Sequence, residues 1–448
     1  MWLSVALFVI TVAQACALTY CALHLGRWLR ILDFPDKQRK LHSRATPRTG
    51  GLAICAALLL GVVEAHGLHA AQAMADAESV RFTAFLLLSA ALLCGLGLWD
   101  DKYGLRARSK FAWQAVAILP FVCWGRSTAT TVLFGWHLDF AWLAVPVMLF
   151  WLVSCTNFVN LLDGLDGLAG SVGLIVSLAV AVLAWWNQIP EASLLALILS
   201  GALVGFLMFN WPPARIFLGD SGSLPLGFLV GALALEASAK KAAGLTLAVP
   251  LVLLSIPMFD TSMAILRRKL NGRRIGQGDR GHIHHCLRDR GWSPTQTLLS
   301  IGSMCTATAA AAVLATVFNN DLIAVGICLA VLAVLISGRL FGFNETVLLM
   351  RHFQAVGAFL KSVPRVLRMK FVVVRLEAAV TAGQLDLWNK IIKRAKRLDG
   401  LEIEFACEHL PSGRKLTSLV WTSGGGASPG GEFPVWQFSY FVPRGAGI

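Results

Sequence analysis

The chain has 448 residues, of which 56% are hydrophobic and only 14% are charged, and its formal net charge is +14. This composition is too apolar for a soluble globular protein and is typical of a protein that crosses a membrane many times. The ten cysteines form no CxxC pair, so we expect neither a disulfide framework nor a cysteine zinc site.

Eleven apolar runs are expected to form membrane-spanning helices, because a spanning helix needs roughly 20 apolar residues. In chain order they cover residues 2–24, 50–68, 82–98, 111–125, 140–157, 168–187, 191–209, 222–237, 244–265, 296–317 and 321–342. The predicted fold class of residues 1–343 is therefore an all-α polytopic membrane domain. The sequence has no strong internal repeat, which argues against a transporter built from inverted repeats.

Positive charge is distributed unevenly between the two sets of loops that these helices would leave. One set holds 20 of the 39 Lys and Arg residues, whereas the opposite set holds four. Since Lys and Arg accumulate in cytoplasmic loops, the first set is predicted to face the cytoplasm. That set consists of residues 25–48, 99–110, 157–170, 210–222 and 266–295.

A different kind of sequence follows residue 343. A basic linker leads to an amphipathic helix pattern at 384–400 and to strand-like alternation at 370–380, 401–410, 415–423 and 434–442. We therefore predict a small α+β domain within residues 344–448, on the cytoplasmic side, with a regulatory or partner-binding role.

Each of the five predicted cytoplasmic loops carries a polar cluster, and none of the outer loops does. The first cluster, DKQRKLHSRATPRTGG, offers Lys40, His42 and Arg48 before two glycines that let the backbone come close to a ligand. This composition suits an anion site for phosphates, and it equally suits basic anchoring at lipid headgroups.

The next two clusters are rich in carboxylates and carboxamides. Asp100 and Asp101 end an apolar run, where they suit a divalent cation, a base with a raised pKa, or an ordinary acidic helix end. The stretch NFVNLLDGLDGLAG spaces four polar side chains three residues apart, namely Asn157, Asn160, Asp163 and Asp166. Side chains at this spacing are neighbours on a helix, and clustered oxygens favour a hard cation, with a capped helix end as the alternative.

The fourth cluster, FLGDSGS, places Asp220 just before an apolar run. Its backbone N–H groups at 219–223 are expected to receive an anion and its carboxylate to complete a Mg²⁺ site, with a plain N-cap as the alternative. The fifth cluster, at 267–291, combines eight Lys and Arg residues with the sequence HIHH. No further Cys or His completes a tetrahedral zinc site, so a clamp for a diphosphate and its sugar is favoured.

Together the clusters indicate transfer of a phosphoryl-linked group to or from a lipid at the membrane surface. A cation-coupled transporter of lipid-linked sugars is the alternative from another class, but it needs acids in mid-span. The apolar runs are almost free of charge, and the main exception, Asp260, follows Pro257 near the cytoplasmic end of its run. The residues therefore favour an enzyme.

The motifs DKQRKLHSRATPRTGG, DD, NFVNLLDGLDGLAG, FLGDSGS and DRGHIHH occur in this order over roughly residues 30–300. In this they resemble the polyprenyl-phosphate N-acetylhexosamine-1-phosphate transferases, the membrane enzymes of glycosyltransferase family 4. The resemblance implies that a polyprenyl phosphate attacks the β-phosphorus of a UDP-N-acetylhexosamine and releases UMP. It also implies a bacterial cytoplasmic membrane location and a Mg²⁺ cofactor, with Mn²⁺ as a substitute. The expected partners are both substrates, the membrane and a second copy of the chain in a homodimer, but no nucleic acid.

The same resemblance assigns roles to individual residues. Asn160 and Asp220 are expected to bind the metal. The expected catalytic residues are Asp100, Asp101, Asp163 and Asp166, with one of the first two taking the proton of the lipid phosphate. Phosphate and sugar are expected to be bound by Lys40, His42, Arg48, Asn157, Asp279, Arg280, His282, His284 and His285.

The last loop bears on the choice of sugar. The branch that transfers phospho-N-acetylmuramoyl-pentapeptide usually carries a longer histidine run than the HIHH found here. The loop looks more like the branch that uses UDP-N-acetylglucosamine and starts O-antigen, teichoic acid or related glycans. The segment RRIGQG departs from the Ser-Pro-Phe-like segment that family members often have, so the identity of the sugar stays open.

Overall fold

The computed structural model divides the chain into two compact units, Met1–Arg351 and His352–Ile448, which are described separately. The residues that the structure describes are 2–34, 45–67, 77–125, 131–133, 136–138, 141–239, 245–246, 248–270, 281–337, 346–347, 349–350, 353–354, 403–405 and 419–421.

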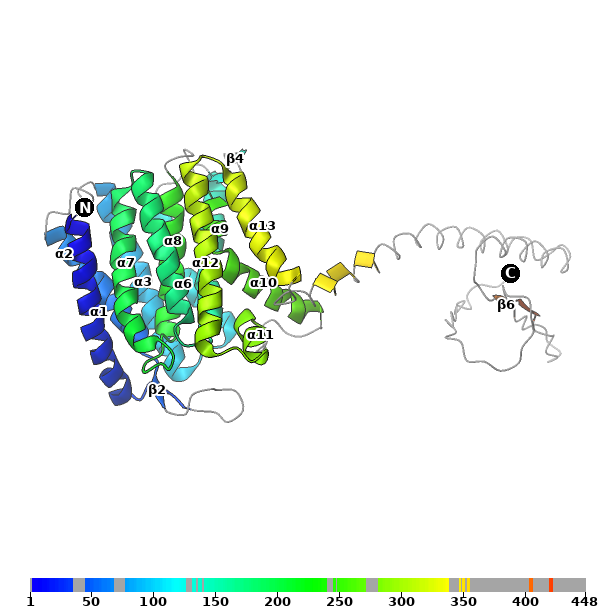
Figure 1. Ribbon diagram of the computed structural model, residues 1–448, viewed down its shortest axis with the longest axis horizontal. Helices are drawn as coiled ribbons and strands as arrows, with labels where there is room; N and C mark the ends of the chain where they lie inside the picture. The colour runs from blue at the N-terminus through cyan, green and yellow to red at the C-terminus, as the bar shows by residue number, and fades with distance from the viewer. Residues whose placement is uncertain are drawn as a thin grey trace, which may run out of the picture. The chain divides into compact units, whose positions relative to one another are not determined.

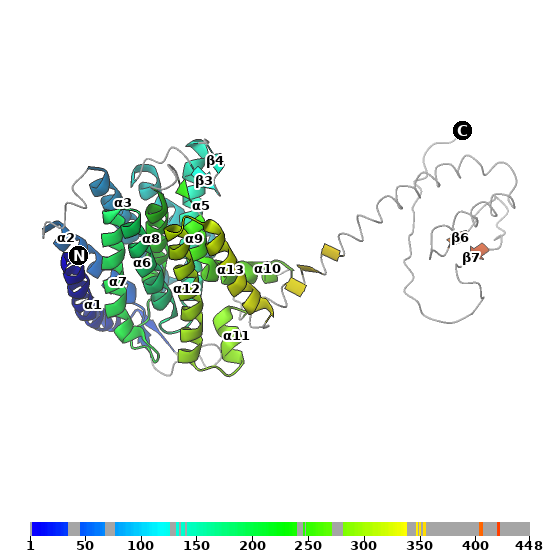
Figure 2. The same ribbon diagram turned by 45° about the horizontal axis from the view of Figure 1, so that its top comes forward.

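The first unit is a bundle of helices that run side by side (Figures 1 and 2). Eight of its described helices are long and apolar enough, by length and composition, to cross a membrane. They are α1 (Trp2–Trp28), α2 (Gly50–Gly67), α3 (Ala77–Tyr103), α5 (Ala141–Leu162), α6 (Leu168–Trp186), α7 (Pro190–Asn210), α8 (Asp220–Ala239) and α12 (Pro294–Val317). A mostly helical, polytopic membrane fold is thus supported.

The other three predicted spans form shorter helices in the described residues. They correspond to α4 (Ala107–Pro120) with the π-helix η2 (Phe121–Gly125), to α9 (Ala248–Leu253) with α10 (Ser255–Leu270), and to α13 (Asp321–Ser337). Proline interrupts regular α-helical hydrogen bonding because it lacks a backbone N–H, and Pro120, Pro250 and Pro257 stand at or near these breaks. Eleven full spans are therefore not confirmed.

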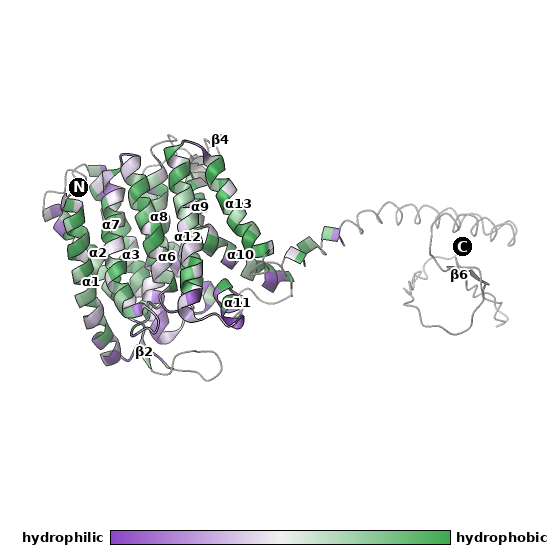
Figure 3. Ribbon diagram, viewed as in Figure 1, coloured by the Kyte–Doolittle hydropathy of each residue, from purple (hydrophilic) through white to green (hydrophobic). Residues whose placement is uncertain are grey.

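The polar clusters that the structure describes lie at one end of the bundle, which we call the polar end. Here α3, α5 and α7 finish and α8 begins, beside β1 (Leu32–Asp33), β2 (Thr46–Pro47) and α11 (Ile283–Asp289). Figure 3 shows hydrophilic residues gathered around β2 and α11, and hydrophobic residues along the helices. A small sheet of order β4-β3-β5, made of Trp136–Leu138, Thr131–Leu133 and Leu245–Thr246, lies at the other end.

Helix α8 is the centre of the bundle. It is buried along its length and packs against α2, α3, α5 and α6. Its Phe228 is fully buried and meets the ring of Phe121 edge-on, with ring centroids 5.3 Å apart. Lipid solvates apolar side chains as well as protein does, so close packing of this kind is what holds membrane helices together.

Glycines let the backbones of α2 and α3 touch the first turn of α8. A Cβ atom at Gly51 would lie 2.1 Å from the backbone nitrogen of Gly222, and one at Gly97 would lie 2.2 Å from the carbonyl oxygen of Asp220. Gly51 belongs to the motif in which we expected glycines to admit a ligand. In the structure the space left by the absence of a side chain at Gly51 is filled by the backbone of α8.

Backbone hydrogen bonds join the segment before α2 to the segment before α8. Strand β2 pairs antiparallel with β1, with Leu32 opposite Pro47. The N–H of Phe217 donates to the carbonyl oxygen of Pro47 at 2.8 Å, and the N–H of Gly50 donates to that of Phe217 at 3.0 Å. Two motifs that lie far apart in sequence are thereby fixed side by side.

In the second unit, β6 (Ile403–Phe405) pairs antiparallel with β7 (Leu419–Trp421), and Glu404 lies opposite Val420. Both strands fall inside segments where alternation predicted strands. The predicted helix at 384–400 and the strand patterns at 370–380 and 434–442 lie outside the described residues. The α+β domain at 344–448 accordingly stays a prediction.

The contact of α3 with α8 can be tested with Gly97→Ala. The added methyl group meets backbone atoms that cannot move aside, so we expect a loss of about 1–3 kcal/mol and a lower Tm in detergent. Gly95→Ala on the same helix is the control, because a Cβ there meets nothing within 4 Å in the described structure. Equal Tm values for the two variants would contradict the packing argument.

Candidate active site

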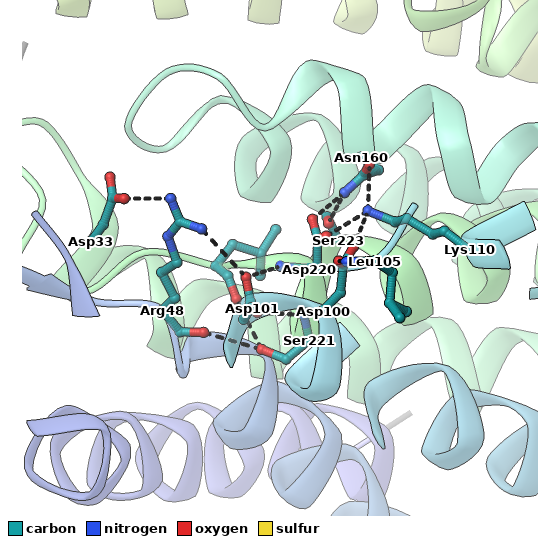
Figure 4. Close-up of polar contacts among 11 residues, drawn as sticks. Asp33, Arg48, Asp100, Asp101, Leu105, Lys110, Asn160, Asp220, Ser221 and Ser223 are labelled. Atoms are coloured by element: carbon teal, nitrogen blue, oxygen red, sulfur yellow. Dashed lines mark hydrogen bonds and ion pairs between the residues drawn. The ribbon is translucent and has the colours of Figure 1, made fainter. Parts of the chain in front are cut away.

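Asp100 and Asp101 lie in the last turn of α3 and point their carboxylates at different partners (Figure 4). Asp101 accepts the N–H of Asp220 at 3.1 Å through Oδ1 and the N–H of Ser221 at 3.0 Å through Oδ2. It therefore caps the first turn of α8 from a neighbouring helix, where the helix dipole also favours a negative charge. Asp100 instead accepts the N–H of Leu105 through Oδ1 and directs Oδ2 into the site.

The N–H groups that open α8 are used within the protein. Those of Asp220 and Ser221 bind Asp101, while those of Gly222 and Ser223 donate to the carbonyl oxygen of Gly219 at 3.0 and 2.9 Å. The N–H groups of residues 220–223 are therefore engaged within the protein, which disfavours the expected anion site on this backbone. A helix N-cap was the alternative prediction for this segment. The start of α8 is capped, but by the carboxylate of Asp101 on α3 and not by Asp220 or Ser221.

The ammonium group of Lys110, on α4, lies at the centre of the polar residues. Its Nζ is 2.8 Å from Oδ2 of Asp100, donates to Oδ2 of Asp220, and is 3.4 Å from Oδ1 of Asn160. Burial opposes the charge on Lys110, but the carboxylates of Asp220 and Asp100 outweigh it and raise the pKa. Lys110 is therefore a permanent cation between two acids.

Three oxygen-bearing side chains thus converge on one cation. Asn160 also donates through Nδ2 to Oδ1 of Asp220 at 2.6 Å and to Oγ of Ser223 at 2.8 Å, and the carboxylates of Asp100 and Asp220 both bind Nζ of Lys110. Among the described residues, no three His, Cys, Asp or Glu side chains form a ready metal cage. Mg²⁺ typically takes only one or two carboxylates together with substrate phosphate, so this donor set fits it.

Asn157 lies one turn before Asn160 and makes its contacts inside the protein. Its Nδ2 donates to Oε1 of Gln114 at 2.7 Å and to the carbonyl oxygen of Val153 at 2.7 Å, and its Oδ1 receives the amide of Gln114 at 3.4 Å. The reciprocal pair joins α4 to α5 one helical turn beyond Lys110 on α4. This geometry favours a positioning role over the expected contact with substrate.

The two remaining acids of the stretch 157–170 have separate environments. Asp166 accepts the N–H of Ala214 at 2.9 Å and so holds the loop that leads to α8. Asp163 is partly buried, and burial together with the negative charges of Asp220 and Asp101 raises its pKa to about 8. A carboxyl group with a pKa near physiological pH is suited to take or give a proton.

Arg48 forms the edge of the site on the side of β2. Its guanidinium group pairs with Asp33 and lies 3.9 Å from Oδ1 of Asp101, and about a third of its side chain is exposed. An arginine held in this way at an open edge can meet an anionic oxygen.

The histidines lie around α11, and one of them reaches the loop at 163–167 between α5 and α6, which we call the acidic loop. The rings of His282 and His284 are parallel with centroids 5.9 Å apart, and those of His284 and His285 are 4.3 Å apart. A Cβ atom at Gly164 would lie 2.7 Å from Nε2 of His284, so His284 fills the space that this glycine leaves. Burial, with His285 adding to it, lowers the pKa of His284 to about 3, so its ring is neutral, and neither ring nitrogen has a hydrogen-bond partner in the described structure.

Four of the expected site residues lie outside the described part of the chain, and two residues of the site were not expected. Lys40, His42, Asp279 and Arg280 lie outside the described residues. Lys110 and Gln114 were not among the expected site residues, although a Gln inside an apolar run is a recognisable signal of a polar contact. Lys110 gave no distinct signal, because it was one of four basic residues in its loop.

Comparison with known proteins gives a match to the family model described as glycosyl transferase family 4, over residues 83–238. That range contains Asp100, Lys110, Asn160 and Asp220. A Bacillus subtilis protein named probable undecaprenyl-phosphate N-acetylglucosaminyl 1-phosphate transferase is 32% identical over 296 residues, which is 66% of this chain and 80% of that protein.

Two further relatives have related names. The decaprenyl-phosphate N-acetylglucosaminephosphotransferase of Mycobacterium tuberculosis is 33% identical over 294 residues, 59% of this chain and 71% of that protein. A phospho-N-acetylmuramoyl-pentapeptide-transferase of Levilactobacillus brevis is 33% identical over 308 residues, 64% of this chain and 88% of that protein.

The cation position can be tested with Lys110→Met in protein freed of divalent cations. Two partly buried carboxylates then lose their counter-charge, and we expect a loss of about 1–3 kcal/mol, less than for a fully buried pair. Because a divalent cation can take the same place, millimolar Mg²⁺ should raise the Tm of the variant more than that of the wild type. Lys102→Met, at an exposed position, is the control. An unchanged Tm without metal would contradict the placement.

The environment of Asp163 predicts how stability depends on pH. The folded carboxyl has a pKa of about 8 and the unfolded one an ordinary value of 3.8, so between them only the folded state keeps the proton. The contribution of this carboxyl group to the free energy of unfolding is therefore fully present below pH 3.8 and is lost as pH rises toward 8. We expect Asp163→Asn to flatten the fall of Tm between pH 6 and about 8, and the exposed Asp289→Asn to leave it unchanged. Parallel curves for all three proteins would refute the assignment.

Proposed function

Because the chain belongs to glycosyl transferase family 4, we propose that it transfers N-acetylglucosamine-1-phosphate from UDP-N-acetylglucosamine to undecaprenyl phosphate. UMP is released, and the lipid-linked sugar starts a cell-surface glycan. The observation that carries this proposal is the convergence of Asp100, Asp220 and Asn160 on the ammonium group of Lys110. Such a cluster suits a cation and phosphate groups at the end of an apolar bundle.

The proposed reaction joins an oxygen of the lipid phosphate to the β-phosphorus of the nucleotide sugar. The bond from that phosphorus to the bridging oxygen breaks, and UMP leaves with the electron pair. The lipid phosphate is already anionic, so it needs positioning and charge neutralisation more than activation. We therefore propose direct attack, without a phosphorylated aspartate.

The residues of the site have different proposed roles in this reaction. Lys110 supplies a fixed positive charge beside the phosphates, and Arg48 supplies a second one at the edge of the site. Asp163 is suited to hold or release a proton near neutral pH. Asp220 and Asn160, with the neighbouring Asp100, would hold Mg²⁺, which when bound supplies further neutralisation of the diphosphate.

The polar end is proposed to face the cytoplasm of a bacterial cell. The support is the charge distribution in the sequence, since the loops predicted to be cytoplasmic hold 20 of the 39 Lys and Arg residues, and the described parts of those loops lie at this end. In this orientation a soluble nucleotide sugar and a membrane lipid reach the same residues. The homodimer expected from the resemblance stays a prediction.

The choice of N-acetylglucosamine rests on the short HIHH sequence and on the names of two relatives. The relative from Levilactobacillus brevis is named for transfer of phospho-N-acetylmuramoyl-pentapeptide. UDP-N-acetylmuramoyl-pentapeptide is therefore the competing donor, and the assay below includes it.

The first test is turnover by purified protein in detergent, with undecaprenyl phosphate and one nucleotide sugar at a time. We expect UMP release and a lipid-diphosphate product with UDP-N-acetylglucosamine, dependent on Mg²⁺ and supported more weakly by Mn²⁺. Turnover with only the muramoyl-pentapeptide donor would assign the chain to the branch that transfers phospho-N-acetylmuramoyl-pentapeptide. No turnover with any UDP-N-acetyl sugar would overturn the proposal.

Asp220→Asn tests the cluster itself. The variant keeps the shape of the side chain but removes the negative charge that binds Lys110 and is proposed to hold the metal. We expect a fall in kcat of at least about 100-fold, with unchanged expression and membrane insertion. Asp289→Asn, at an exposed position on α11, serves as the matched control and should retain full turnover. Near-normal activity of Asp220→Asn would show that the reaction does not require this cluster.

A further inference from the structure

Asp260 is a buried acid that the proposed reaction does not use. It lies on α10 with only 2% of its surface exposed. Its Oδ2 is 2.9 Å from Nδ1 of His282, which is 6% exposed, and its Oδ1 accepts the N–H of Ile283 at 2.8 Å. A buried carboxylate is costly unless its oxygens are paired, and both oxygens are paired here.

We propose that Asp260 is a positioning residue that acts through His282 on the bound diphosphate–sugar substrate. The carboxylate holds the proton on Nδ1 and fixes the plane of the ring. Nε2, on the opposite side of the ring, is then the atom that meets an oxygen of the substrate. This assignment rests on the proposed function, since it gives His282 a phosphate or sugar partner.

The position of His282 within the site supports this assignment. Its ring lies parallel to that of His284, and His284 fills the space above Gly164 in the acidic loop. Asp163 immediately precedes that glycine. His282 is therefore linked through the ring of His284 to the loop that carries Asp163, which directly follows helix α5 and its Asn160.

The two oxygens of Asp260 have separable roles. Oδ1 binds the first N–H of α11 and is structural, whereas Oδ2 sets the proton of His282. Asp260→Asn separates the two. The backbone N–H of Ile283 keeps the carboxamide oxygen in the Oδ1 position, so the NH₂ group faces Nδ1. An NH₂ group can only donate, so Nδ1 must lose its proton and Nε2 must carry it.

The kinetic test compares Asp260→Asn with wild type in the detergent assay. We expect kcat/KM for UDP-N-acetylglucosamine to fall about 10- to 100-fold, as for carboxylates that orient metal-binding histidines, with Tm essentially unchanged. KM for undecaprenyl phosphate should change little. Thr261→Val is the control, because Thr261 is buried next to Asp260 and its hydroxyl finds no partner in the described structure. It should keep wild-type kinetics.

A double-mutant cycle tests whether Asp260 acts through His282. If it does, His282→Gln alone and His282→Gln combined with Asp260→Asn lose activity to the same extent. Independent, multiplying losses would overturn the assignment. So would wild-type kinetics of Asp260→Asn, or a drop in Tm large enough to account for its loss of activity.

A spectroscopic test does not depend on turnover. In protein labelled with ¹⁵N-histidine, the ring signals that disappear in His282→Gln identify His282. We expect a protonated Nδ1 in wild type and a bare Nδ1 in Asp260→Asn. A bare Nδ1 in wild type would refute the proposal while leaving the transferase assignment intact, whereas inactivity of the wild type with every donor would overturn both.

Discussion

The structure depends on the carboxylate of Asp101, which binds the first two N–H groups of α8. This contact joins the end of α3 to the start of the central helix, and it is possible only because Gly97 and Gly51 leave room for the backbone of α8. Membrane helices approach closely through small residues, and a helix start needs partners for its free N–H groups. The same contact brings Asp100 beside Asp220, so the packing of the bundle assembles the site.

Charge balance is the second constraint at this end of the bundle. Asp100, Asp101, Asp163 and Asp220 lie close together at this end, so their negative charges repel one another. Lys110 and Arg48 offset part of this negative charge, and the hydrogen bonds from Asn160 and from the start of α8 offset more. The proposed Mg²⁺ would neutralise further negative charge at this site.

The polar residues divide into those that hold the helices in place and those that converge on Lys110. Asp101, Asp166 and Asn157 satisfy their hydrogen bonds with backbone or neighbouring side chains, and so hold α8, its preceding loop and α4 in place. Asp100, Asn160 and Asp220 instead converge on one ammonium group. All six were candidates for direct roles on the basis of residue type, which does not show where an oxygen points.

The sequence by itself determined the class of fold and the positions of the polar clusters. A long apolar run satisfies its backbone groups in lipid only as a helix, and alternate loops between such helices meet at one end. Only the tertiary structure decided which polar atoms pair, as with Lys110 and Asp220, which are 110 residues apart, or Asp260 and His282, which are 22 apart. It also decided that the glycines near α8 serve helix packing. The physical reason is that such pairs depend on helix rotation and packing, which local patterns of residue type do not encode.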